Sequence, residues 1–325
     1  MHIDQFLKFE PILKEKIWGG EKLITLLNKK SNRNNIGESW EVSDVEGDRS
    51  VVINGNLKGK TLKELIYTFK GDFLGEKIYQ QFGEKFPLLI KFIDAKEALS
   101  VQLHPNDTLA KSRHNSFGKT EMWYVLQVDE NANLIVGFKK EVTPEEYVEN
   151  LNRGTLLDIL NVDEVSSGDV YFIPTGRVHA IGGGVLLAEI QQTSDITYRI
   201  YDWDRPNSEG AFRKLHTDEA VDAIDYSAKE SYKTEYKKVL NTSSEIVSCP
   251  YFTTNAITIN GNIEINHKEK DSFVIYMCVD GEVEFKYKNQ MEILKVGETI
   301  LVPACIKEIK IISELKSELL EVYIK

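Results

Sequence analysis

One pattern occurs twice in the sequence and constrains the fold more than any other feature. Gly168–His179 and Gly297–Glu308 each contain a Gly-acid pair, a four-residue strand-like run and a proline at the same offset. A Gly-acid turn before a short apolar run predicts a turn and a buried strand. We therefore predict a duplicated β-domain whose second copy has Glu308 where the first has His179. Coincidence is the alternative, because turn–strand–proline is a common pattern.

Short strand-like runs dominate the rest of the chain. Residues 86–93 and 133–138 are apolar and bounded by turn residues, as buried strands are. Residues 273–287 form two such runs around Asp280-Gly281, which predicts a hairpin. Evenly spaced short strands predict a mainly β fold built as a sandwich or barrel.

Two helices are predicted from capping boxes at Thr61–Glu64 and Thr143–Glu146, and a weaker one at 217–224. The first two fall in segments at about 57–85 and 143–161, which we expect to be helical insertions in the N-terminal domain.

Residues 227–244 are rich in Lys, Glu and Ser, which indicates a boundary between two domains. The length of 325 residues also fits two domains. We predict one domain over 1–235, which contains the copy with His179, and a degenerate copy over 236–325.

Charge and cysteine usage restrict the partners. Asp+Glu 51 against Lys+Arg 40 gives a net charge of −11, which disfavours nucleic acid and anionic membranes. The 3 cysteines lack ligand spacing, so neither a disulfide scaffold nor a cysteine zinc site is expected. The N-terminus lacks a signal-peptide pattern and no apolar run is long enough to span a bilayer. We expect a cytoplasmic protein, a monomer or weak homodimer.

Four separated residues form the candidate metal site. Gln102 and His104 are two apart at the end of a strand-like run and can face one interior. Glu121 begins another run, and His179 follows the Pro-x-Gly turn. These side chains suit Zn²⁺ or a similar divalent ion, although each alone is more often structural or solvated. The remaining histidines lack such context and are expected at the surface: His2, His114, His216 and His267.

The motifs resemble known families. Gly168-x5-Pro-x-Gly-x2-His179 resembles the second signature motif of the cupin superfamily. Gln102-x-His-Pro, Lys119-x-Glu and Pro174-x-Gly-x-x-His-Ala resemble the short bacterial form of type I mannose-6-phosphate isomerase, as do residues 37–43 and 189–204. The resemblance extends from about Trp18 to Asp204 and implies two cupin (jelly-roll β-barrel) domains, the second similar only in outline.

The same resemblance implies the site residues. It implies one Zn²⁺ per chain, held by Gln102, His104, Glu121 and His179. It also implies Arg199 as the catalytic arginine, with Ser100, Lys119 and Glu189 in the active site. In longer family members a Thr-Pro-Lys follows the catalytic arginine and its lysine faces the substrate; in this chain Arg205 is the candidate for that role. Longer members also have Tyr at the position of Ile181.

The implied activity is the interconversion of mannose 6-phosphate and fructose 6-phosphate through an enediol or enediolate. A divalent ion and an arginine stabilise its oxygen charge, and a general base takes the carbon-bound proton. Glu189 has the same parity as Arg199 and would face the same side if no turn occurs at Ser194-Asp195. A histidine or metal-bound hydroxide is the alternative base. An iron-dependent oxygenase and a non-catalytic sugar-binding cupin are the alternative functions.

Overall fold

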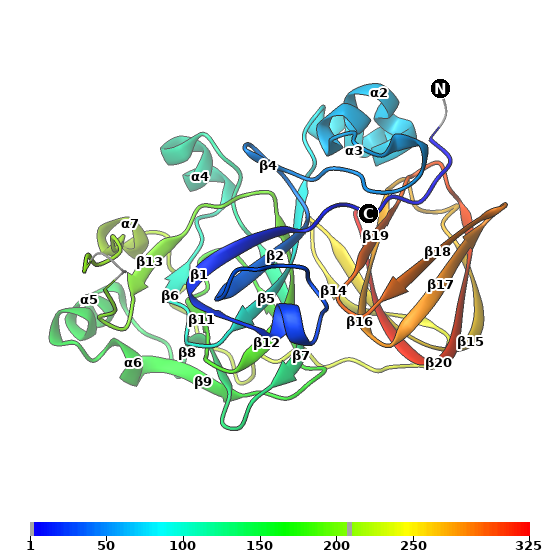
Figure 1. Ribbon diagram of the computed structural model, residues 1–325. Helices are drawn as coiled ribbons and strands as arrows, with labels where there is room; N and C mark the ends of the chain where they lie inside the picture. The colour runs from blue at the N-terminus through cyan, green and yellow to red at the C-terminus, as the bar shows by residue number, and fades with distance from the viewer. Residues whose placement is uncertain (1–2, 207–209) are drawn as a thin grey trace.

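The computed structural model describes residues 3–206 and 210–325, and β-strands predominate in them, so the predicted mainly β class is confirmed. Figure 1 shows two β-rich bodies side by side, one formed by the N-terminal two thirds of the chain and one by the C-terminal third. The strand pairings of the described residues close neither body into a barrel, so the jelly-roll detail stays a prediction.

The N-terminal body contains two main sheets, with a small β3–β4 ribbon (Asp44–Val45, Asp48–Arg49) beside them. The larger has the order β1 (Ile12–Gly20), β2 (Ile36–Val42), β5 (Leu88–Ala95), β12 (Val185–Gln192), β7 (Glu121–Val128) and β10 (Val170–Ile173). The smaller has the order β13 (Tyr198–Tyr201), β6 (Val101–Leu103), β11 (His179–Ile181), β8 (Asn133–Phe138) and β9 (Leu160–Glu164).

The C-terminal body is organised around one long strand, β20 (Glu308–Tyr323). The other strands are β14 (Ser243–Ser248), β15 (Thr253–Asn266), β16 (Val274–Asp280), β17 (Glu282–Tyr287), β18 (Gln290–Lys295) and β19 (Thr299–Val302). The predicted 273–287 hairpin is wrong, because β16 and β17 each pair with β20 instead of with each other. Strand β17 forms its hairpin with β18.

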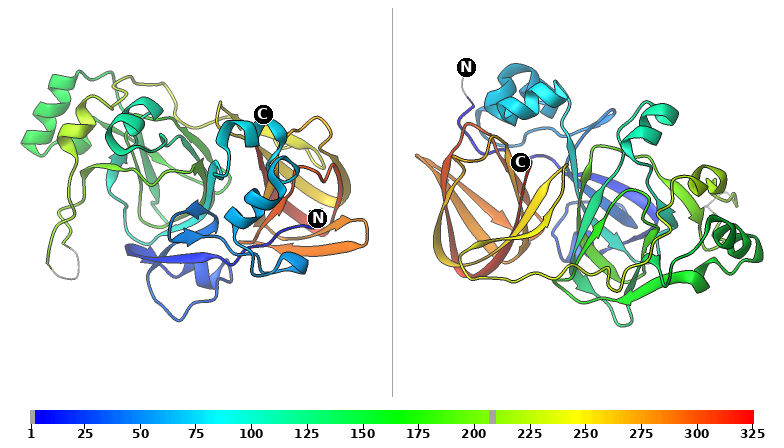
Figure 2. Two further views of the ribbon diagram at one scale, coloured as in Figure 1. Left: turned by 90° about the horizontal axis from the view of Figure 1, so that it is seen from above. Right: turned by 180° about the vertical axis from the view of Figure 1, so that it is seen from behind.

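The helices cover the outside of the sheets and the space between the two bodies (Figure 2). They are α1 (Lys22–Thr25), α2 (Leu62–Leu74), α3 (Glu76–Phe82), α4 (Asp107–His114), α5 (Pro144–Arg153), α6 (Leu156–Ile159), α7 (Thr217–Val221) and the 3₁₀ turn η1 (Gly55–Leu57). Both predicted capping boxes are present, at the start of α2 and of α5. The third predicted helix, 217–224, is present as α7, but it ends at Val221. No described helix is long and apolar enough to cross a membrane.

The repeated pattern has the same hydrogen bonding in both copies. The Gly168 N–H donates to the Val125 carbonyl at 2.8 Å, and the Gly297 N–H donates to the Cys278 carbonyl at 2.9 Å. In return the Val125 and Cys278 N–H groups donate to the residue after each glycine, at 2.9 and 3.0 Å. Both glycines have positive φ (90° and 83°), which favours glycine there. This agreement supports duplication over coincidence.

The two bodies share one hydrophobic core. It is formed by buried apolar side chains of α2, the β5 and β12 strands and the C-terminal β16 and β20 strands, among them Phe73, Phe92, Ile190, Ile275 and Val322.

The first residues of the chain extend this contact into the second body. Phe6 is fully buried in the C-terminal core against Phe285. Leu7 exchanges two backbone hydrogen bonds with Leu301, at 2.8 and 2.9 Å. The N-terminal segment therefore completes the C-terminal body.

Candidate active site

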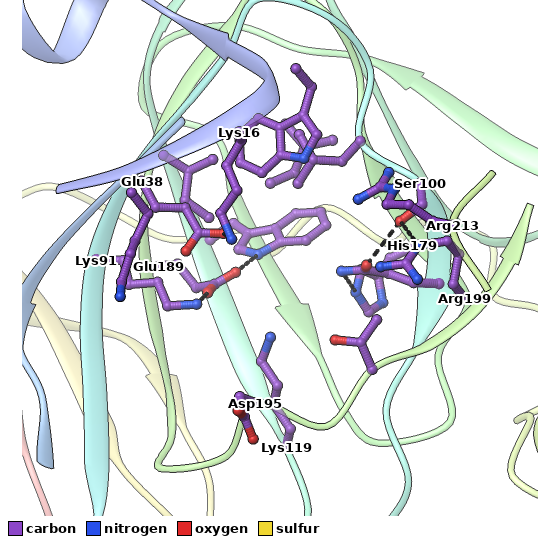
Figure 3. A pocket seen from close by; sticks show the side chains of 18 of the residues that line it. Lys16, Glu38, Lys91, Ser100, Lys119, His179, Glu189, Asp195, Arg199 and Arg213 are labelled. Carbon is purple, nitrogen blue, oxygen red and sulfur yellow. Dashed lines mark hydrogen bonds and ion pairs between the residues drawn. The ribbon is translucent and has the colours of Figure 1, made fainter. Parts of the chain in front are cut away.

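A cavity of about 490 Å³ in the N-terminal body collects residues from both of its sheets (Figure 3). Six of the predicted site residues line it: Ser100, Gln102, Lys119, His179, Glu189 and Arg199. His104 and Glu121 lie next to it and are within reach of His179. Arg205 is not among the lining residues.

Strand register explains why these residues meet. His179 on β11 and Arg199 on β13 both lie opposite Gln102, which is on the strand between them. The turn before β11 is tied to β6, because the Gly176 N–H donates to the His104 carbonyl at 2.8 Å. Residues far apart in sequence are thus held side by side by backbone pairing.

His104, Glu121 and His179 form a group that can hold a metal ion, with ligand atoms within 4.8 Å of one another. Nε2 of His104 is 3.4 Å and Nε2 of His179 is 3.5 Å from the Glu121 carboxylate. Each Nδ1 lies 2.8 Å from a backbone carbonyl, of Ile196 and Arg177 respectively. Nδ1–H donation to those carbonyls fixes the rings and leaves the Nε2 lone pairs directed at the site.

Three donor atoms of this group are buried and lack hydrogen-bond partners among the described residues. This holds for Nε2 of His104 and both Glu121 oxygens, although Lys119 Nζ lies at an ion-pair distance of 3.1 Å. Orphaned buried polar atoms are costly. Their convergence fits a bound divalent cation.

Protonation also favours metal binding. Burial lowers the pKa of His104 to about 4, helped by Lys119 and opposed by Glu121. Burial likewise lowers the pKa of His179. Burial raises the pKa of Glu121, but Lys119 and His104 outweigh this and hold it well below its usual value. At neutral pH the site offers two neutral imidazoles and one carboxylate, the forms that ligate metals.

Gln102 lies at the edge of this group. Its amide nitrogen is 3.4 Å from Nε2 of His179, and its oxygen accepts from the Ser100 hydroxyl at 3.3 Å. The amide must rotate for its oxygen to join the other ligand atoms. Its position fits the predicted ligand role, which stays a prediction.

Glu189 is a buried carboxylate with two donors. Lys91 Nζ donates to one oxygen at 3.0 Å, and the Trp123 indole N–H donates to the other at 3.1 Å. Glu189 and Arg199 both line the cavity, but they come from two strands separated by residues 193–197. The single-strand premise behind their shared parity is therefore wrong.

Several lining residues were not predicted. Lys14, Lys16 and Trp18 alternate on β1, as do Glu38 and Trp40 on β2. Period-two alternation could have identified them. Three more of the lining residues have no clear sequence signal: Lys91, Arg213 and His216.

One histidine prediction is wrong, the surface position of His267. His216 is half-buried and lines the cavity, where its backbone N–H donates to the Arg199 carbonyl at 2.7 Å. His267 is buried in the C-terminal body, where its Nε2 lies 2.7 Å from the Tyr276 hydroxyl. His114 is exposed as expected, and His2 lies outside the described residues.

The fold and this donor group define a β protein with a candidate metal centre beside a polar cavity. Residues 6–131 match the family described as phosphomannose isomerase type I, catalytic domain, and residues 242–323 match mannose-6-phosphate isomerase, cupin domain.

Relatives of known name match almost the whole chain. Mannose-6-phosphate isomerase ManA of Bacillus subtilis is 34% identical over 94% of this chain and 95% of its own length. The Streptococcus mutans mannose-6-phosphate isomerase is 31% identical over 90% of both. The crystal structure of the B. subtilis mannose 6-phosphate isomerase superposes with a TM-score of 0.88 at 33% identity, covering 98% of this chain and 99% of that one. The chain is therefore an enzyme of the type I mannose-6-phosphate isomerase family.

Proposed function

We propose that this protein is a zinc-dependent aldose–ketose isomerase that interconverts mannose 6-phosphate and fructose 6-phosphate. One observation carries the proposal: a buried His/Glu/His group, a buried carboxylate and two guanidinium groups adjoin a single cavity. The names of the relatives supply the substrate pair.

The zinc ion, one per chain, would be held by Gln102, His104, Glu121 and His179. When bound, it would act as a Lewis acid that polarises the sugar carbonyl.

The reaction moves a proton between C1 and C2 through an enediolate. Glu189 is the proposed base, because its carboxylate is fixed in the cavity wall by Lys91 and Trp123. Arg199 would stabilise the negative oxygen of the enediolate, since its guanidinium is held next to Gln102 by the Ser100 hydroxyl at 3.2 Å. Lys119 and Ser100 would orient the sugar.

The predicted domains, location and oligomeric state also become part of the proposal. Residues 1–235 form the catalytic domain and 236–325 the degenerate one, with Phe6 and Leu7 crossing between them. All three cysteines are free thiols, which fits the proposed cytoplasmic location. The enzyme would act as a monomer or weak homodimer.

The test measures the conversion of mannose 6-phosphate by metal-stripped protein before and after addition of Zn²⁺. A coupled assay detects the fructose 6-phosphate that is formed. Zinc should restore activity, and Arg199→Ala should abolish it while zinc stays bound. Arg153→Ala on the exposed face of α5 is the control. Wild-type protein that stays inactive with zinc would refute the proposal.

The metal ligands are tested by zinc content after dialysis. His104→Ala and His179→Ala should each lose zinc, whereas the exposed His114→Ala should keep it. Full occupancy in both site variants would exclude these histidines as ligands.

A further inference from the structure

The lysines of the cavity are already neutralised. Each has a carboxylate partner: Lys14 with Asp48, Lys16 with Glu38 at 3.2 Å, Lys91 with Glu189 at 3.0 Å and Lys119 with Glu121 at 3.1 Å. None of them is a free cation for a doubly charged ligand.

The two arginines of the cavity differ from the lysines. Among residues 3–206 and 210–325 no carboxylate forms an ion pair with Arg199, which donates to the Ser100 hydroxyl and to the Lys214 carbonyl at 3.1 Å. Arg213 shares a single carboxylate, Asp202, with Arg205. This side of the cavity therefore carries excess positive charge.

The excess positive charge also shows in the pKa of Arg199. Burial lowers the pKa of Arg199, and the neighbouring Arg213 lowers it further, while Asp202 opposes both. Two adjacent guanidinium groups with one carboxylate between them favour an anionic ligand.

The contacts also give the order of groups along this wall. His179 contacts Gln102, Gln102 contacts Ser100, and Ser100 contacts Arg199. Arg213 lies near Ser100 and Arg199 (Figure 3), with its side chain 27% exposed. Figure 3 shows both arginines on the His179 side, across from Lys16, Glu38, Lys91 and Glu189.

Arg213 is also held in place. Its Nε donates to Asp202 Oδ2 at 2.7 Å and its Nη2 donates to Oδ1. Asp202 is held in turn by Arg205, which donates to it at 3.4 Å and to the Ala98 carbonyl at 3.1 Å. No described residue accepts from Nη1 of Arg213, and the side chain lines the cavity, where a ligand can reach it.

We propose that Arg213 binds the phosphate group of the substrate and that Arg205 supports it through Asp202 without touching the substrate. The proposal rests on the proposed function for the identity of the substrate. The sugar then lies along the wall with its reacting carbons at the metal and Glu189 and its phosphate at Arg213. A guanidinium edge suits phosphate oxygens, because it offers planar, permanently charged donors.

The test measures inorganic phosphate binding to the zinc-loaded protein by calorimetry, without turnover. Arg213→Gln should weaken binding by about 10- to 100-fold, the range for a charge-assisted hydrogen bond. Arg213→Lys keeps the charge but loses the planar edge, so it should bind with intermediate affinity. Arg49→Gln is the matched control, because Arg49 is also bonded to an aspartate through Nε and its side chain is 32% exposed. Arg49→Gln should bind phosphate like the wild type.

The proposal is overturned if Arg213→Gln binds phosphate within about twofold of the wild type, or if Arg49→Gln or Arg205→Gln loses as much affinity. Far-ultraviolet circular dichroism checks folding, and Arg213→Lys carries the test if Arg213→Gln does not fold. Turnover separates the two proposals. Arg213→Gln should raise KM for mannose 6-phosphate more than it lowers kcat, whereas failure of the proposed function would leave the wild type inactive with phosphate still bound at Arg213.

Discussion

Removing Lys91 alone from the buried Lys91–Glu189 ion pair should cost more stability than removing both charges. The two side chains are 8% and 4% exposed and their charged atoms are 3.0 Å apart. In Lys91→Met, the Glu189 charge would stay buried with only the Trp123 indole N–H as donor. In Glu189→Gln, Lys91 would still have Glu38 nearby: burial lowers the pKa of Lys91, but Glu189 and Glu38 together raise it above its usual value.

The expected losses of stability differ because Glu189 has no second cationic partner among the described residues, whereas Lys91 has Glu38. An uncompensated buried charge costs about 3–5 kcal/mol, which we expect for Lys91→Met. Glu189→Gln should cost about 1–3 kcal/mol, because a hydrogen bond to a charged group is weakened while Lys91 keeps Glu38. Replacing a whole buried pair is often close to neutral, so the double variant should recover the part of the loss that comes from Glu189, while the buried Glu38 still lacks Lys91. The coupling energy should be at least about 2 kcal/mol.

Urea unfolding of the four proteins at pH 7, followed by circular dichroism, measures the cycle. The midpoints should shift with little change in the slope of the free energy of unfolding against urea. Losses that add within about 0.5 kcal/mol would refute the reasoning, since the two charges would then not depend on each other.

Three further predictions concern the pocket rim, the metal and the join between the bodies. Burial raises the pKa of Glu38, but Lys91 and Lys16 outweigh it and hold the pKa at about 2, below the ordinary 4.5. The lowered pKa therefore stabilises the folded protein above pH 4.5, and this stabilisation is lost as the pH falls toward 2. Between pH 7 and pH 3 the wild type should lose about 2 kcal/mol more of its free energy of unfolding than Glu38→Gln does. Equal losses of the two proteins in urea unfolding would contradict this prediction. Chelation of the metal should lower the melting temperature of the wild type but not of His179→Ala, and calorimetry giving equal shifts in both would count against the site. Phe6→Ala should cost about 3–5 kcal/mol, since the ring is fully buried against Phe285, and a loss below about 1 kcal/mol in urea unfolding would exclude its role in the C-terminal core.

Features formed by residues that are close together in the sequence could be predicted from it. The capping boxes of α2 and α5 form within four residues, so their residue types alone identify them. The 273–287 hairpin failed for the opposite reason. Strand β20 is long enough to pair with both β16 and β17, and nothing within 273–287 reveals that competing partner.

The candidate site likewise contains some residues that the sequence identifies and others that it does not. His104, Glu121 and His179 belong to compact motifs and converge as expected. Arg213 reaches the cavity only because the chain turns back after β13, through the left-handed residues Trp203 and Asp204, and His216 then bonds to Arg199. No short pattern encodes such a return.

The sequence neighbours of His267 give no sign of burial, which is why the sequence predicts it at the surface. It is instead buried beside Tyr276, and the half-buried His216 stacks on Tyr198. Partners that come from other strands provide the polar and aromatic contacts that a histidine needs in an interior.

The docking of Phe6 and Leu7 into the C-terminal body also bears on how the enzyme is made. Leu7 is translated long before its backbone partner Leu301. At about 5–20 residues per second, the first segment waits roughly 15–60 s for the strand that it joins. The contacts of Phe6 and Leu7 with the C-terminal body therefore cannot form until Leu301 has been translated, and the nascent chain keeps these two apolar residues without those partners until then.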